Sequence, residues 1–149
     1  MATILVPVDL DEESSWRKAL PTAVDQARLT GGKVHLVHVV PHITAGLDWR
    51  YAIRGETGGT LDYDVKELQE AARKRLGELM AQHVPPELQG ETLVPHGTIY
   101  DEIIKTVDEL GADLVVMASH RPSLKDYLLG PNTARVARHA RTSVHIVRE

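Results

Sequence analysis

Short runs of almost continuous hydrophobic residues, rich in branched side chains, divide the chain. They occupy residues 3–8, 34–40, 113–118 and 143–147, with a weaker run at 91–95. Because polar residues do not alternate with the hydrophobic ones, these runs are typical of parallel strands that are covered on both faces. Pro7 lies near the end of the first run, where its missing N–H disturbs a sheet least.

Stretches with helical spacing of hydrophobic residues lie between these runs. They predict helices at residues 14–29, 64–83, 99–110 and 131–141. Pro21 is expected to kink the first of these helices or to delay its start. Thr98 and Asp101 form a variant capping box that opens the third.

Strands and helices therefore alternate strictly along the chain. Such alternation predicts an α/β fold, in which one open parallel sheet carries helices on both faces and the crossovers are right-handed. The length of 149 residues suits a single domain, 1–149. Residues 41–61 have no clear period and many glycines, and we interpret them as a long excursion that either covers a site or faces a partner.

Composition excludes several classes of function. The 17 basic and 21 acidic side chains give a formal net charge of -4 without long blocks of either sign, which argues against a nucleic-acid partner. Cysteine is absent, so disulfides, thiolate metal sites and cysteine nucleophiles are excluded. No basic leader opens the sequence and no hydrophobic run reaches the roughly 20 residues of a membrane helix, so we expect a cytoplasmic protein without a membrane partner.

The expected ligand site lies at the carboxyl ends of the strands, where the strand order of an open α/β sheet reverses. Three loops meet there, after the first, second and fourth strands, and they include Asp9, Val39 and the His120–Arg121 pair. The stretch 130–133 (Gly-Pro-Asn-Thr) opens the last helix, whose N-terminus offers unpaired N–H groups to an anion such as a phosphate.

Ordinary local structure explains the same residues. Gly130 can be a turn glycine, Pro131 a first-turn proline, and Asn132 or Thr133 a helix cap. On spacing alone this explanation is preferred to phosphate binding, because short motifs often match by chance. For Asp9, ligand binding and capping of the next helix are equally supported.

The segment VVMASHRPSLKDYLLGPNTARVARHARTSVHIVR resembles the C-terminal signature of the universal stress protein family. That signature is usually Gly-x-x-Gly, about nine further residues, and then Gly-Ser or Gly-Thr. The F/G-type branch, with its ASHRP, YLLGSN and VRHA elements, is most similar. ILVPVDLDEESS and VHLVHVVP also match the family, so the resemblance covers nearly the whole chain except residues 41–61.

The resemblance implies a strand order of 3-2-1-4-5, as in adenine nucleotide alpha hydrolase-like folds. It also implies a homodimer through the last strand, Ser143–Val147. It further implies a site for ATP or another adenine nucleotide, which can bind together with Mg²⁺. Carried over by position, the nucleotide-binding residues are Pro7, Asp9, Val39, Met117, Ala118, His120, Arg121, Gly130, Asn132 and Thr133.

Each part of the nucleotide has its expected partners. Asp9 would meet the adenine or ribose edge, and the backbone of Val39 would contact the adenine. Met117, Ala118, His120 and Arg121 would line the ribose and the phosphates. The phosphate chain would be bound by Gly130, Asn132 and Thr133.

Three residues depart from the family pattern. Ala118 and Arg121 replace the two glycines of the first motif; the F/G branch tolerates the alanine, and the guanidinium of Arg121 can pair with a phosphate. Pro131 stands where serine is usual, which removes one hydroxyl and one N–H from the phosphate site. The loss is on the order of 1–3 kcal/mol if a phosphate oxygen goes unsatisfied, so AMP or ADP should compete well with ATP.

Catalysis has little support in the sequence. No Walker lysine motif and no serine-centred hydrolase elbow occurs. The acidic stretch from Asp9 to Glu13 can hold Mg²⁺ together with a nucleotide, but a solvated helix start is the preferred explanation. The sequence thus favours a dimeric, nucleotide-binding regulatory protein of the stress response with little or no turnover. The alternatives are a docking module of the same fold that has lost nucleotide binding, and a slow ATP hydrolase.

The eight histidines do not predict a metal site. His35 and His38 lie three apart in a strand, so the pleat directs them to opposite faces of the sheet. Four others, His42, His83, His96 and His145, lack neighbours at ligand spacing, and we interpret them as structural or solvated residues.

Overall fold

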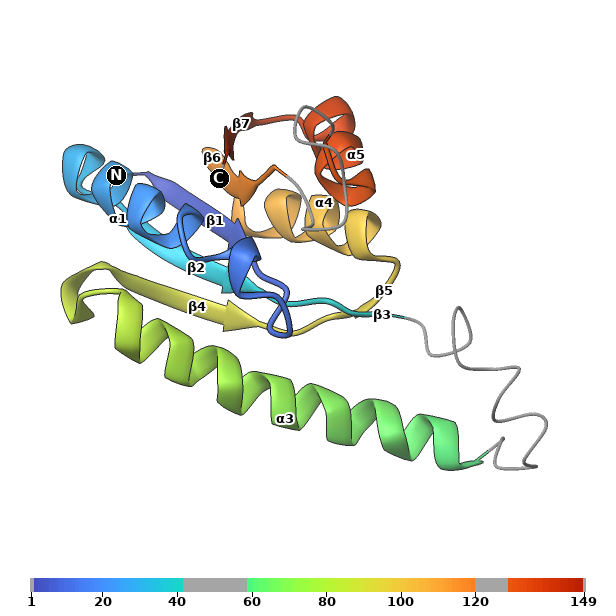
Figure 1. Ribbon diagram of the computed structural model, residues 1–149. Coiled ribbons are helices and arrows are strands. Elements are labelled where there is room, and N and C mark those ends of the chain that lie inside the picture. The colour runs from blue at the N-terminus through green and yellow to red at the C-terminus, as the bar shows by residue number, and fades with distance from the viewer. Residues whose placement is uncertain (1, 42–58, 120–128, 149) are drawn as a thin grey trace.

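A five-stranded parallel sheet forms the centre of the computed structural model, which describes residues 2–41, 59–119 and 129–148 (Figure 1). Its strands are β1 (Thr3–Pro7), β2 (Lys33–Val37), β4 (Gln89–Leu93), β6 (Leu114–Ala118) and β7 (Ser143–Val147). Their order across the sheet is β4-β2-β1-β6-β7, and each neighbouring pair is parallel. Counted along the chain, this is the predicted order 3-2-1-4-5.

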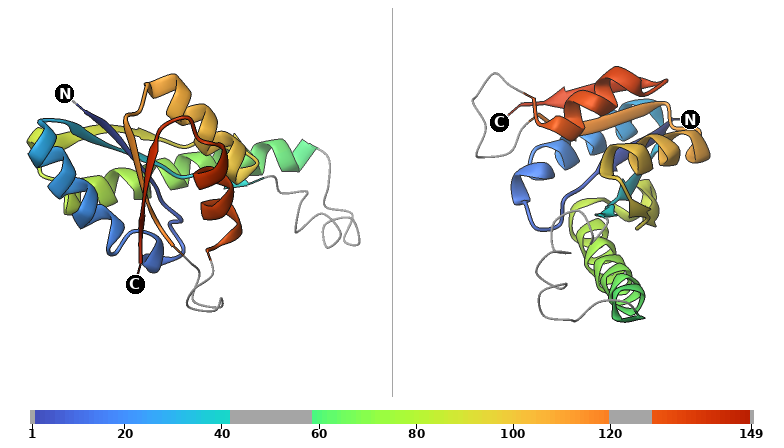
Figure 2. Two further views of the ribbon diagram at one scale, coloured as in Figure 1. Left: turned by 90° about the horizontal axis from the view of Figure 1, so that it is seen from above. Right: turned by 90° about the vertical axis from the view of Figure 1, so that its right-hand side faces the viewer.

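Helices cover both faces of this sheet (Figure 2). They are α1 (Ala19–Thr30), α3 (Gly59–His83), α4 (Ile99–Leu110) and α5 (Pro131–His139), and two short 3-10 turns are η1 (Glu13–Ser15) and η3 (Pro86–Leu88). Buried residues of α1 and α3 form a core on one face, and those of α4 and α5 form a core on the other. The predicted α/β fold is confirmed.

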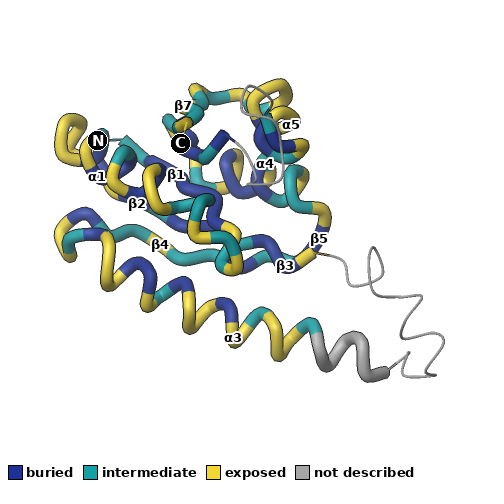
Figure 3. The backbone as a smooth tube through the Cα atoms, viewed as in Figure 1, coloured by how far each residue is buried: buried dark blue, intermediate teal, exposed yellow. Residues whose placement is uncertain are grey.

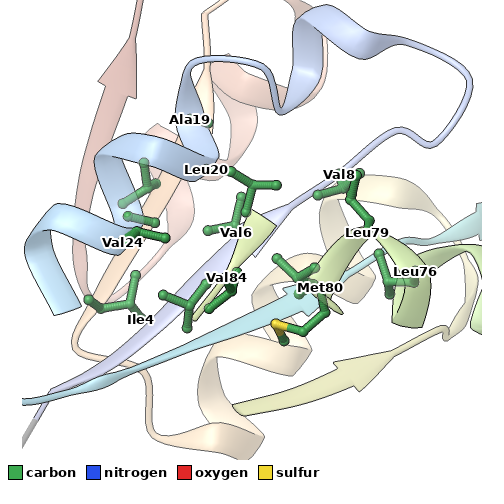
Figure 4. Close-up of a cluster of buried hydrophobic side chains, with 14 of the residues drawn as sticks. Ile4, Val6, Val8, Ala19, Leu20, Val24, Leu76, Leu79, Met80 and Val84 are labelled. Carbon is green, nitrogen blue, oxygen red and sulfur yellow. The ribbon is translucent and has the colours of Figure 1, made fainter. Parts of the chain in front are cut away.

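The continuous hydrophobic runs arise because alternate residues of each strand enter opposite cores. In β1, Ile4 and Val6 belong to the core beneath α1 and α3, whereas Leu5 belongs to the core beneath α4 and α5. Figure 4 shows Ile4 and Val6 together with Leu20 of α1 and Leu76 of α3. In Figure 3 the central strands are largely buried, and the outward turns of the helices are exposed. Because neighbouring strands are parallel, their carboxyl ends all lie along one edge of the sheet, where the candidate site is expected.

The second hydrophobic run, residues 34–40, does not form one strand as predicted. β2 ends at Val37, and after two residues the short strand β3 (Val40–Pro41) pairs in parallel with β5 (His96–Gly97). This small second sheet follows the ends of β2 and β4. It directs the chain away from β2 and leads from β4 into α4, beside the candidate site.

Four expectations about where helices begin and end need correction. Residues 13–15 form η1, and α1 begins only at Ala19, so that Pro21 falls within the first turn, where a proline is tolerated. The capping box is not formed: Thr98 precedes α4, but its side chain makes no cap hydrogen bond. The last helix ends at His139, before the predicted end at 141, and α3 begins at Gly59 rather than at 64.

Most of the stretch 41–61 lies outside the described residues. Pro41 belongs to β3 and residues 59–61 belong to α3, whereas residues 42–58 are not described. The expectation that this stretch covers a site or faces a partner therefore stays a prediction. Among the described residues, no helix has the length and hydrophobicity to cross a membrane.

Candidate functional site

A cavity of about 360 Å³ lies at the carboxyl ends of β1, β2 and β6. The loops after β1 and β2, the end of β6 and the first turns of α4 and α5 line it. The strand order reverses at β1, since the chain moves from β1 to β2 and β4 on one side and later to β6 and β7 on the other. The cavity thus lies where ligands bind in open α/β sheets.

The structure brings together eight of the ten residues predicted for the site. The cavity lining includes Pro7, Asp9, Val39, Met117, Ala118, Gly130, Asn132 and Thr133. The other two, His120 and Arg121, lie outside the described residues. They stay predictions, as does the role of each residue toward a ligand.

Other lining residues were not predicted from the sequence. Ile99 and Ile103 lie one turn apart at the start of α4, and both line the cavity beside Met117. The sequence predicted a helix over residues 99–110, but it gave no indication that these two side chains line a cavity. His38 also lines the cavity, whereas the sequence indicated only that it does not share a metal ion with His35.

The carboxylate of Asp9 is held in a local turn. Its Oδ1 accepts the N–H of Asp11 at 3.0 Å, a typical Asx-turn contact. The amide of Asp9 donates to Oγ of Ser15 at 2.9 Å, and this hydroxyl lies 2.7 Å from the carbonyl of Glu12. Asp9 does not cap the next helical segment, because η1 and α1 have no side-chain cap. Asp9 is thus exposed and lines the cavity, and one of its two carboxylate oxygens is already bonded to the N–H of Asp11.

The N-terminus of α5 also lines the cavity. Gly130 is its N-cap and Pro131 its first residue, as one of the two sequence interpretations has it, but neither Asn132 nor Thr133 caps the helix. The N–H of Gly130 donates to the carbonyl of Ser119 at 2.9 Å. The hydroxyl of Thr133, a buried residue, donates to the carbonyl of Ala118 at 2.9 Å. Two of the expected phosphate donors are therefore already used within the protein.

The backbone of α5 supplies the remaining donors. Pro131 has no N–H, so the first-turn amides without an intrahelical acceptor are those of Asn132 and Thr133. They lie at the positive end of the helix dipole, which favours an anion. The lining also includes the acidic residues Asp9, Asp11 and Glu12. We call the part of the lining around these three residues the acidic end and the N-terminus of α5 the anion-binding end.

The acidic end is not a metal site formed by the protein alone. Within the described part of the chain, no three His, Asp or Glu side chains lie close enough together to hold a metal ion. A cation at Asp9 or Asp11 would need further oxygen ligands from a bound molecule.

The fold and this cavity define the class: a doubly wound α/β protein with a cavity at the switch point of its sheet. The model of the Universal stress protein family matches residues 1–148. The Universal stress protein G of Escherichia coli O157:H7 is 33% identical over 150 residues, which cover 98% of both chains. This chain belongs to the universal stress protein family.

Solved structures agree with this family and fold. A universal stress protein crystallised in complex with cAMP has a TM-score of 0.61 and 26% identity, covering 99% of this chain and 96% of that one. The universal stress protein from Archaeoglobus fulgidus in complex with dAMP has a TM-score of 0.59 and 21% identity, covering 99% and 98%. The second likeness is evidence for the fold alone.

Proposed function

We propose that this protein binds an adenine nucleotide in the cavity at the ends of β1, β2 and β6. In this proposal the whole chain acts as one domain and serves as a regulatory protein of the stress response. The observation that carries the proposal is the cavity itself, which joins an exposed carboxylate, a hydrophobic middle and a helix N-terminus in one space. The complex of a related universal stress protein with cAMP supports the adenine nucleotide as the ligand class.

The residues of the cavity fit the three parts of such a ligand. Val39, Ile103 and Met117 are buried hydrophobic residues that suit the faces of an adenine ring. Asp9 can accept hydrogen bonds from a ribose hydroxyl or from an adenine amine. The amides of Asn132 and Thr133 suit a phosphate. A volume of about 360 Å³ is within the usual range for small-molecule sites.

We infer little or no turnover from the chemistry of the lining. Phosphoryl transfer needs a positioned cation or metal at the transferred group and a residue that positions the nucleophile. The described lining residues include no lysine or arginine, and the protein carboxylates do not form a metal site alone. If Mg²⁺ takes part, Asp9 or Asp11 would hold it together with phosphate oxygens of the nucleotide. The alternative is slow ATP hydrolysis, which can be tested by a phosphate-release assay with wild-type protein.

The edge strand β7 is the proposed dimer contact. Within the described chain β7 pairs only with β6, so its outer edge presents unpaired backbone groups. Pairing with β7 of a second copy would satisfy them. Sedimentation equilibrium should give twice the chain mass of 16.5 kDa. A monomer mass at every concentration tested would overturn the proposed dimer without affecting the nucleotide site.

A docking module that has lost nucleotide binding is the second candidate. It is favoured by the donors that α5 lacks: Pro131 has no N–H, and the N–H of Gly130 and the hydroxyl of Thr133 bond within the protein. Such a module would keep the fold and the dimer and would leave the cavity without a nucleotide. Binding measurements decide between the two candidates.

Calorimetric titration with AMP, ADP and ATP tests the proposed function. Wild-type protein should bind at least one of them, and Asp9→Ala should weaken that binding by about tenfold or more, as expected for loss of a charged hydrogen-bond partner. Asp25→Ala, which removes an exposed carboxylate from α1, is the matched control and should bind like wild type. Absence of binding by wild type, with no nucleotide in its acid extract, would support the docking module.

A further inference from the structure

His38 connects the two loops that border the acidic end of the cavity. Its backbone is fixed beyond the end of β2, where its N–H donates to the carbonyl of Leu93 at 3.0 Å. Its side chain reaches the loop after β1, and its Nδ1 lies 2.9 Å from the carbonyl oxygen of Val8 and 3.3 Å from the amide nitrogen of Leu10. These two backbone groups flank Asp9 on either side.

We propose that His38 is a positioning residue for nucleotide binding, which sets the distance between Asp9 and the backbone of Val39 through its contacts with the loop after β1. The proposal rests on the proposed function, because it deepens the account of the same site. Val39 follows His38 directly, so one residue contributes both to the adenine side of the cavity and to the placement of the carboxylate opposite.

A single ring nitrogen cannot serve both backbone groups at once. As Nδ1–H it donates to Val8, and with its lone pair it accepts from Leu10. The contact with Val8 has the length of an ordinary hydrogen bond, whereas 3.3 Å is long for the contact with Leu10. The shorter distance favours the Nδ1–H tautomer, in which His38 donates to the carbonyl of Val8.

Other contacts explain why this one bond matters for Asp9. Arg75 of α3 donates to the carbonyl of Leu10 at 2.8 Å and lies 3.2 Å from a carboxylate oxygen of Asp11. Ser15 bonds the amide of Asp9. The loop is thus held by side chains of α3 and η1, and His38 adds a side-chain contact from the segment that follows β2. Without that contact the loop keeps its other two anchors, so the fold should survive while the position of Asp9 becomes less defined.

The test compares His38→Leu with His38→Asn, because the amide nitrogen of asparagine can occupy the place of Nδ1 and donate to Val8. Titration of wild type with adenosine and with AMP gives the reference affinities. His38→Leu should weaken both ligands by the same factor, about tenfold, since the change concerns the nucleoside end and not the phosphate end. His38→Asn should restore most of the affinity. His139→Leu, at the exposed end of α5, is the matched control and should leave it unchanged.

Measurements without ligand separate this proposal from the proposed function. In ¹⁵N spectra of the wild-type protein at pH 8, His38 should show the Nδ1–H tautomer. Amide exchange at residues 9–11 should be faster in His38→Leu and return toward wild type in His38→Asn. If wild type binds neither adenosine nor AMP, the proposed function fails, and the tautomer and the exchange rates still decide whether His38 positions the loop. The Nε2–H tautomer, or unchanged exchange and affinity in His38→Leu, would overturn the proposal.

Discussion

Thr133→Val tests whether the hydroxyl of Thr133 serves the protein or the ligand. Thr133 is only 8% exposed, and its hydroxyl donates to the carbonyl of Ala118 at 2.9 Å. Valine has nearly the same shape, but it leaves that carbonyl without its donor. The loss of such a bond in a buried place costs about 1–2 kcal/mol. For a chain of this length, each kcal/mol corresponds to roughly 2–4 °C in Tm, so Tm should fall by roughly 2–8 °C.

Nucleotide affinity should respond differently from stability. Because we assign the phosphate to the amides of Asn132 and Thr133, which valine retains, Thr133→Val should keep the AMP affinity of wild type within about threefold. Thr133→Ser is the control, since it retains the hydroxyl and loses only a methyl group. Thermal unfolding followed by circular dichroism gives Tm, and calorimetric titration gives the affinity. A tenfold loss of AMP affinity in the valine variant, with an unchanged Tm and normal binding by the serine variant, would refute this reasoning.

Two further predictions concern stability. Burial lowers the pKa of His35, whose Nδ1 accepts the N–H of Glu91 at 2.9 Å; the carboxylate of Glu91 opposes this shift. Because this pKa is lower in the folded than in the unfolded protein, the contribution of His35 to the free energy of unfolding is fully present above about pH 6.5. It is lost as the pH drops through the folded pKa. Urea unfolding gives the free energy of unfolding at pH 7.5 and at pH 5. Between these two pH values it should decrease more for wild type than for His35→Gln, and equal decreases would contradict this prediction. Gly77→Ala within α3 has free space for its Cβ and should stabilise by about 0.5–1 kcal/mol, whereas Gly32→Ala should destabilise, because its Cβ would meet the carbonyl of Ala2. Chemical denaturation of both variants checks these signs.

The sequence predicted the strands well because both faces of the sheet are covered. Residues 3–8 and 113–118 are almost continuously hydrophobic, and in the structure their alternate side chains enter the two cores. Hydrophobic spacing does not determine the order of the strands, because the same spacing is compatible with every order. The order was instead inferred from the family resemblance. Within the run 34–40, hydrophobicity concealed the end of β2 at Val37, because residues 39 and 40 are buried outside the main sheet.

Helix ends were predicted less well where local signals compete. Pro21 was recognised as an obstacle within 14–29, yet the sequence did not show that it falls in the first turn of a helix starting at Ala19. Thr98 has the residue type and spacing of a cap, but its side chain makes no such bond. Capping depends on side-chain rotation and on competing partners, and neither is encoded in spacing.

In the candidate site, too, the positions of the residues were predicted better than their hydrogen bonds. Parallel strands end at one edge of a sheet, so Asp9, Val39 and Met117 converge as predicted. Which donors remain for a ligand depends on tertiary contacts that spacing does not reveal. Gly130 and Thr133 were expected to donate to a phosphate, but the N–H of the first and the hydroxyl of the second bond to the residues that end β6.

These bonds change the expected strength of phosphate binding. From the sequence, Pro131 was expected to weaken the phosphate site. In the structure the neighbouring donors of Gly130 and Thr133 are also engaged, and the amides of Asn132 and Thr133 remain. Two amides can satisfy one phosphate group more fully than a chain of three. Recognition in this protein should therefore depend more on the nucleoside end, where His38 and Asp9 lie, and less on the number of phosphates. AMP, ADP and ATP should then bind with similar affinities, and a steep rise in affinity from AMP to ATP would contradict this reasoning.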